Sequence, residues 1–221
     1  MKLKSLLAAV VLAAISHTSE AASITASNLA DDFSKAVPIV TTANTVVAAN
    51  SGIIQVGTFG TLSDAQISSI NAGNYAGLVA DFQSFGASTK FGAGFDIAGL
   101  YSLAPSAGIL AGDSKIGKSI YVFIGNGTTL ANSTEIAIFK DDNSFAADAP
   151  LFSAKAYPTD LANNAAIDAA FVVGDISANQ VTIAGVGTFN PIKMVNVSLV
   201  PEPSVALLGL MGIGLVRRRR S

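Results

Sequence analysis

The feature that most constrains the fold of this chain is a set of short apolar runs, each about the length of a β-strand. Six such runs are present, at residues 53–59, 119–124, 135–139, 171–173, 180–184 and 194–199. Gly, Asn, Asp and Ser, the residues that favour turns, are frequent between them. Short β-rich runs separated by turn signals are typical of a β-sandwich. We therefore predict a mainly β body, folded as an antiparallel β-sandwich.

One stretch, residues 63–85, has a helical pattern instead. Ser63 and Gln66 form a capping box, which predicts a short helix reaching about residue 70. A second helix is predicted over 75–85, closed by Gly86 as C-cap. Its apolar side chains recur at helical spacing: Leu78, Phe82 and Phe85. We expect one or two short helices within 63–85, packed over an edge of the sheet.

Charge is sparse and unevenly distributed. Charged residues make up 13% of the chain, about half the ~25% of ordinary globular domains. Between residues 22 and 200 there are seven Lys, no Arg and 13 Asp or Glu. This acidic stretch has the usual size of one domain and gives no electrostatic reason to hold phosphate backbones. A nucleic-acid partner is therefore not expected.

The N-terminus has the three parts of a secretory signal. Lys2 and Lys4 form a basic start, residues 6–15 are apolar throughout, and Ser19 and Ala21 are small residues where signal peptidase reads. The alternative is a membrane anchor, but ten apolar residues span only about 15 Å as a helix, against a hydrocarbon core of ~30 Å. We predict a helical signal peptide over 1–21, with cleavage after Ala21.

The C-terminal segment, residues 200–221, combines an elbow, an apolar helix and a basic end. Pro201 and Pro203 hold Glu202 in an extended conformation, because proline resists helix formation. An apolar helix is predicted over 204–216, and a stop-transfer cluster follows it: Arg217, Arg218, Arg219 and Arg220. A helix of about 20 Å, weakened by three glycines, is short for a permanent span. We predict a temporary inner-membrane anchor behind an exported domain, residues 22–199.

This segment resembles the PEP-CTERM sorting signal, which has a P-E-P tripeptide, a short Gly-containing apolar helix and a terminal arginine cluster. The resemblance implies that Pro201, Glu202 and Pro203 are recognised by an exosortase, a membrane-embedded cysteine protease or transpeptidase of Gram-negative-type bacteria. It implies a transient encounter, cleavage near the tripeptide, and transfer to the cell surface or exopolysaccharide, with which the mature form could associate. A plain C-terminal anchor after a Pro-rich linker is the alternative.

The body also resembles small PEP-CTERM proteins of Verrucomicrobia-type bacteria. Three segments carry this resemblance: V-G-T-F-G at 56–60, D-F-x-x-F-G at 81–86 and G-x-x-I-Y-V-F-I at 117–124. The group has no activity that the resemblance could transfer to this chain.

Residue types exclude several kinds of chemistry. The chain has no Cys, and its single His, His17, lies within the predicted signal peptide. The mature chain therefore lacks the residues for Ser-His-Asp or Cys-His catalysis and for His- or Cys-ligated metals. Neither a P-loop nor a strand-linked G-x-G-x-x-G motif is present. We expect no cofactor, no metal and no catalytic residue.

Carboxylates are the remaining candidates for chemistry. Glu135 heads a predicted strand, and Asp81, Asp96 and Asp113 are its candidate partners in a glycosidase-like pair, which needs a separation of roughly 5–10 Å. A lone acidic residue beside a turn is usually solvated, so catalysis is not favoured. Oxygen ligands for a hard cation such as calcium occur at 141–143, but without the spacing of a calcium loop, and a solvated turn is favoured there.

Aromatic residues bear on carbohydrate binding. The chain has no Trp and four tyrosines: Tyr75, Tyr101, Tyr121 and Tyr157. Tyr121 and Phe123 alternate along a predicted strand, so they share one face, either as an exposed stripe or, the favoured interpretation, as core.

Three functions stay open. The leading hypothesis is an exported, non-catalytic protein of the cell surface or exopolysaccharide matrix, sorted through its C-terminal segment. The alternative is an extracellular carbohydrate-binding module, and a carboxylate-dependent glycan hydrolase is third. An exposed line of aromatic rings would favour the second hypothesis, and two carboxylates in one groove the third.

Overall fold

The computed structural model describes residues 22–29, 36–109, 112–146, 153–156 and 170–197. These residues form a mainly β body with antiparallel sheets and two short helices, as the sequence predicts. The predicted helices at the two ends of the chain lie outside the described residues.

A six-stranded antiparallel sheet forms the centre of the molecule. In spatial order its strands are β10 (Ala170–Val173), β8 (Glu135–Ser144), β7 (Ser119–Gly125), β3 (Ile53–Phe59) and β4 (Phe82–Ser84), and β15 (Val195–Asn196) also pairs with β8. The predicted run 53–59 coincides with β3, and the runs at 119–124 and 135–139 lie within β7 and β8.

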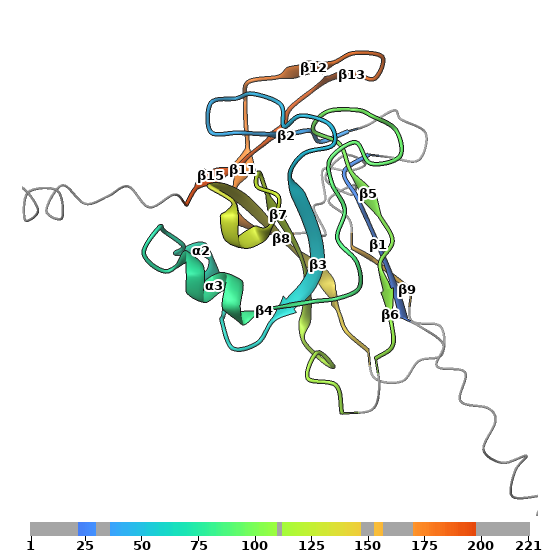
Figure 1. Cartoon of the computed structure of the whole chain (residues 1–221), viewed down its shortest axis with the longest axis vertical. Coiled ribbons are helices and arrows are strands. Elements are labelled where there is room, and N and C mark those ends of the chain that lie inside the picture. The colour runs from blue at the N-terminus through green and yellow to red at the C-terminus, as the bar shows by residue number, and fades with distance from the viewer. Residues whose placement is uncertain (1–21, 30–35, 110–111, 147–152, 157–169, 198–221) are drawn as a thin grey trace, which may run out of the picture.

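A second sheet packs against one face of the central sheet. It consists of β1 (Ala22–Ser27), β5 (Ser102–Leu103), β6 (Ser106–Ala107) and β9 (Ser153–Ala156). Figure 1 shows this sheet on one side of β3, β7 and β8, with helices α2 (Asp64–Ser68) and α3 (Tyr75–Asp81) on the other side. The predicted sandwich is therefore present, and the helices add a third layer to it.

Smaller strands complete the fold. One three-stranded sheet has the order β11 (Asp175–Ile176), β14 (Ile192–Lys193) and β2 (Ile39–Val40), and β12 (Val181–Ile183) forms a hairpin with β13 (Gly187–Phe189). Two pairings are parallel, β1 with β9 and β2 with β14, in contrast to the antiparallel pattern that the sequence predicts. Both join segments that are far apart in the chain, which is the usual situation for parallel strands.

The central strands are buried on both faces. Successive side chains of a strand point to opposite faces of its sheet. In β7, Ile120, Val122 and Ile124 belong to the core that also contains Ile24 of β1. Tyr121 and Phe123 belong to a second core, which contains the helix residues Ile67, Tyr75 and Leu78. This double burial explains why the run at 120–124 is apolar throughout.

Helix α2 begins as the sequence predicts. The Ser63 hydroxyl accepts a hydrogen bond from the Gln66 backbone N–H at 3.4 Å, and Gln66 Oε1 accepts one from the Ser63 backbone N–H at 3.0 Å. The predicted capping box is confirmed. Ile67 is fully buried and packs the helix against the sheet.

Helix α3 is shorter than the sequence predicts. It ends at Asp81, and the next three residues form strand β4, which pairs with β3. Gly57 allows this pairing, because a Cβ on it would lie 2.3 Å from the Gln83 backbone oxygen. Phe82 contacts the core beneath the helices, whereas Phe85 is buried in the other core. The prediction that Phe82 and Phe85 share a helix face is therefore wrong, because sheet pairing overrides the helical spacing.

Candidate functional site

The residues of the predicted sorting signals lie outside the part of the chain that the structure describes. They are Ser19, Ala21, Pro201, Glu202, Pro203 and the arginines at 217–220. None of the described helices is long and apolar enough to cross a membrane. The export and sorting predictions therefore rest on the sequence of these segments.

Each of the four candidate carboxylates accepts hydrogen bonds from neighbouring groups in the structure. Asp96 accepts a hydrogen bond from Asn50 Nδ2 at 2.9 Å, and Asp113 Oδ1 accepts from the backbone N–H and the ammonium of Lys115, at 2.9 and 3.4 Å. Among the described residues, no group of three or more His, Cys, Asp or Glu gathers where it could hold a metal ion.

Glu135 is bound to the loop that follows β2. Its Oε1 accepts hydrogen bonds from the backbone N–H of Thr42, at 3.2 Å, and from the Thr42 hydroxyl. Its Oε2 is buried, as is Oδ1 of Asn44, and neither oxygen has a hydrogen-bond partner among the described residues. The strand prediction that placed Glu135 at the head of β8 is confirmed.

Asp81 binds the backbone of the loop that connects β3 to α2. It accepts hydrogen bonds from the backbone N–H groups of Thr61 and Leu62 at 2.9–3.0 Å, and from the Thr61 hydroxyl at 2.9 Å. Burial alone would raise the pKa of Asp81, but these hydrogen bonds outweigh burial and lower the pKa. Asp81 is therefore an ionised carboxylate with a structural role at the end of α3.

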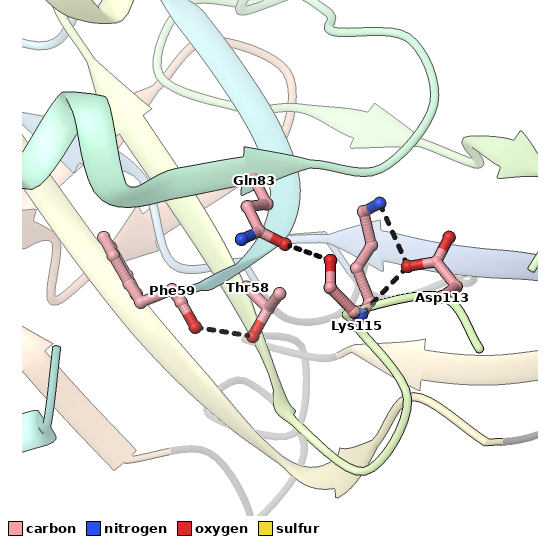
Figure 2. Close-up of polar contacts among 6 residues, drawn as sticks. Thr58, Phe59, Gln83, Asp113 and Lys115 are labelled. Atoms are coloured by element: carbon pink, nitrogen blue, oxygen red, sulfur yellow. Dashed lines mark hydrogen bonds and ion pairs between the residues drawn. The ribbon is translucent and has the colours of Figure 1, made fainter. Parts of the chain in front are cut away.

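The structure brings Asp81 and Asp113 to the same end of the central sheet. Figure 2 shows Gln83 on β4 pointing toward the turn that contains Asp113 and Lys115, where Gln83 Oε1 accepts a hydrogen bond from the Ser114 hydroxyl at 3.0 Å. A Cβ on Gly60 would lie 2.9 Å from Asp81 Oδ1 and 3.0 Å from Gln83 Nε2, so both groups lie against this glycine.

Glu135 lies at the opposite end of that sheet. Glu135 precedes Ile136, which pairs with Gly125 of β7. Gly125 in turn pairs with Ile53, the first residue of β3. Asp81 precedes Phe82, which pairs with the last residue of β3. Six residue steps along a strand measure about 20 Å. Glu135 is therefore too far from Asp81 and Asp113 to form a glycosidase pair, which needs roughly 5–10 Å.

The turn predicted at 141–143 is wrong. These residues lie within β8, where Tyr121 pairs with Lys140 but Ser119 pairs with Ser144. Three residues of β8 thus stand opposite one residue of β7, which makes a bulge in the strand. Asp141 is buried, and its Oδ1 accepts hydrogen bonds from the backbone N–H and the side-chain amide of Asn143, both at 2.7 Å.

The described tyrosines are core residues. Tyr75, Tyr101 and Tyr121 are each at most 6% exposed, and Tyr157 lies outside the described residues. The rings of Tyr121 and Phe123 both pack against Phe59, with centroids 5.0 and 6.1 Å from it. The favoured interpretation of these two residues as core is confirmed, and an exposed stripe is excluded.

A polar contact that the sequence does not reveal joins α2 to the central sheet. Asp64, the first residue of α2, accepts hydrogen bonds from the Tyr121 hydroxyl at 2.5 Å and from Lys140 Nζ at 2.6 Å. Burial raises the pKa of the Asp64 carboxyl, but its hydrogen bonds to Lys140 and Tyr121 and the positive charge of Lys140 lower it further than burial raises it. The three residues are separated by up to 76 positions, so no local pattern could indicate the contact.

A hollow of about 550 Å³ lies between α2 and α3. This volume is within the ~300–1,000 Å³ range of small-molecule sites. The residues that line it come from the loop after β3, from the two helices and from their connection: Thr61, Leu62, Gln66, Ser69, Ile70, Asn74, Gly77, Leu78, Ala80 and Asp81. The sequence predictions above do not include this hollow.

Gly77 is the one signal in the sequence that could have indicated the hollow. A glycine inside a helix costs about 0.8–1.0 kcal/mol relative to alanine. A Cβ on Gly77 would meet no atom within 4 Å, so packing does not require a glycine at this position of α3.

Comparison with known proteins yields no assignment. No family model, no curated protein and no solved structure matches this chain. A functional proposal must therefore come from the residues themselves.

Proposed function

We propose that the protein is an exported, non-catalytic component of the cell surface or extracellular matrix of a Gram-negative-type bacterium, sorted through its C-terminal segment. The observation that carries this proposal is the order of three features: Pro201, Glu202 and Pro203, then the apolar segment 204–216, then four arginines. Each feature has a physical purpose, since the prolines present Glu202, the apolar segment stalls in the bilayer, and the arginines resist translocation.

The enzyme implied by the resemblance of this segment is an exosortase. It would bind the tripeptide at the membrane, cleave the chain near it and release the body to the cell surface. The inner membrane and the exosortase are then transient partners. An apolar helix that is short and rich in glycine suits such a passing role better than a permanent span.

The contacts of the body support a non-catalytic role. Asp81 is held by Thr61 and Leu62, and Asp113 by Lys115, in arrangements that stabilise loops. Glu135 is separated from two of its three candidate partners, Asp81 and Asp113, by the length of β3, and the third, Asp96, accepts a hydrogen bond from Asn50. A binding role, the alternative function, is favoured by the hollow between α2 and α3.

The experiment that tests the sorting proposal is fractionation of the native host with and without its exosortase, followed by intact-mass analysis. With the enzyme, the surface fraction should contain a chain that begins at Ala22 and ends at or beside residues 201–204. Without the enzyme, the chain should begin at Ala22, keep residues 205–221 and remain in the inner membrane. A surface form that keeps 205–221 in both strains would contradict the proposal.

A further inference from the structure

One helix residue that lines the hollow between α2 and α3 has no side chain. Gly77 lines it, and the space into which a Cβ would project is empty to at least 4 Å. Gly77 does not have the left-handed backbone conformation that requires glycine. The fold therefore would accept a larger residue there, and a larger residue would fill the hollow.

The polar groups around the hollow have hydrogen-bonding capacity left for a ligand. Gln66 uses Oε1 to accept from Ser63, and its Nε2 donates to none of the described residues. The Ser69 hydroxyl donates to the Gln66 backbone oxygen and can still accept. Asn74 Nδ2 reaches only the Ser69 backbone oxygen, at 3.5 Å, and retains a second hydrogen. Donors and acceptors are thus both available, and all three side chains are neutral.

The charge at the hollow argues against ionic ligands. None of the residues that line it in the described part of the chain is Lys or Arg, so an anion finds no partner there. Asp81 is the one ionised group, and hydrogen bonds from Thr61 and Leu62 already occupy its two oxygens. A cation therefore gains little from it.

Three aliphatic side chains also line the hollow. Leu78 is buried, and Leu62 and Ile70 are partly exposed beside it. These side chains offer an apolar surface next to the amide and hydroxyl groups of Gln66 and Ser69.

We propose that this hollow is a binding site for a neutral sugar, held with its hydroxyls on Gln66, Ser69 and Asn74 and its C–H face on the aliphatic side chains. A neutral sugar combines the features that the lining requires, because its hydroxyls both donate and accept, it has no charge, and its ring has an apolar face. The source could be a free sugar or a residue within a polysaccharide. The site rests on the hollow alone and does not depend on how the chain is sorted.

Saturation-transfer NMR on the full-length protein tests this site, in a detergent without a sugar headgroup. The probes are glucose, galactose, mannose and N-acetylglucosamine, with glucuronate as the anionic comparison. We expect at least one neutral sugar to bind and glucuronate not to bind. A soluble oligosaccharide of the sugar that binds then distinguishes a polysaccharide source, which should bind more tightly than the monosaccharide, from a free-sugar source, which should not.

Two matched variants of α3 locate the binding. Gly77→Phe should fill the hollow and raise the Kd at least about tenfold. Ala76→Phe places the same ring on an exposed residue of the same helix that does not line the hollow, and should leave the Kd unchanged. Thermal unfolding of both variants checks that they are folded. The proposal is overturned if no neutral sugar binds at millimolar concentration, if glucuronate binds equally well, or if the two folded variants lose binding to the same degree.

Discussion

Tyr121 donates a hydrogen bond to Asp64 Oδ1 at 2.5 Å and thereby ties the first residue of α2 to the middle of β7. Lys140, the cross-strand neighbour of Tyr121 on β8, donates to the other oxygen of the same carboxylate at 2.6 Å. Side chains from two adjacent strands thus bind the first residue of α2. Because α2 is only five residues long and cannot be stable by itself, this contact and the burial of Ile67 determine where the helix sits on the sheet.

The first prediction concerns this contact. Tyr121→Phe keeps the buried ring and removes only the hydroxyl, so it should lower the free energy of unfolding by about 1 kcal/mol. Chemical denaturation of the wild type and the variant measures the difference. In an Asp64→Asn background the same substitution should have a smaller effect, because its charged acceptor is gone. Equal losses in both backgrounds would show that the hydroxyl stabilises the fold through some other contact.

The second prediction concerns acid. The pKa values of Asp64, Asp81 and Asp113 are each lowered below the usual 3.8 in the folded chain. A carboxyl whose pKa is lower in the folded than in the unfolded state stabilises the fold above the unfolded pKa, and this contribution is lost as the pH falls through the folded pKa. The free energy of unfolding should therefore decrease as the pH falls below about 4.

Denaturant unfolding at neutral and acidic pH measures this loss. Asp81→Asn removes one of the three groups and should reduce the drop in stability between the two conditions. A wild-type stability that stays constant or rises on acidification would contradict the assignment of these hydrogen bonds.

The third prediction compares two glycines. Gly77→Ala should stabilise the protein by roughly 0.5–1 kcal/mol, because the helix gains and nothing obstructs the new methyl group. Gly57→Ala should destabilise it, because the new Cβ would lie 2.3 Å from the Gln83 backbone oxygen and would push β4 away from β3. Thermal unfolding of the pair is the measurement. If Gly77→Ala also destabilises, the space beside α3 is not empty.

The fourth prediction concerns a buried amide. Asn28 is fully buried, donates from Nδ2 to the backbone oxygens of Val37 and Gly99 at 2.9 and 2.8 Å, and accepts from the Tyr101 N–H at 2.7 Å. Asn28→Leu has a similar size but removes the hydrogen-bond partner of two buried backbone groups, the Val37 oxygen and the Tyr101 N–H, each worth about 1–3 kcal/mol, whereas the Gly99 oxygen keeps its bond from the Ile39 N–H.

We expect this variant to unfold at markedly lower denaturant concentration, or not to fold at all. Asn179→Leu, on an exposed residue of the loop after β11, is the control and should change stability by less than about 0.5 kcal/mol. A variant at residue 28 that is as stable as this control would contradict the role of Asn28.

Much of the sheet could be predicted from the sequence because it depends on local signals. β3 matches its predicted bounds because glycines flank an apolar run, and α2 begins directly after its N-cap Ser63 because the capping box is complete within four residues. The end of α3 could not be predicted in this way. The helical spacing continues to Phe85, and only the pairing of β4 with β3 stops the helix at Asp81.

Less of the candidate site than of the sheet could be predicted from the sequence. The polar residues at 141–143 are typical of a turn. In the structure they form a bulge, because the pairing of β8 with β7 keeps them in the strand. The distance between Glu135 and Asp81 follows from strand register, which the sequence does not contain. The hollow forms only when α2 and α3 lie side by side on the sheet, so among its residues only Gly77 left a local signal.

In the proposed function Pro201, Glu202 and Pro203 direct sorting, so the decisive variant replaces these three residues by alanines. Replacing Asn179 and Gln180, both exposed, by alanine is the control and should not alter sorting. After expression in the native host, the surface and inner-membrane fractions are compared by intact mass. We expect the triple variant to remain in the inner membrane and to keep residues 205–221, while the control reaches the surface without them. A triple variant that reaches the surface with residues 205–221 removed would show that the tripeptide does not direct sorting.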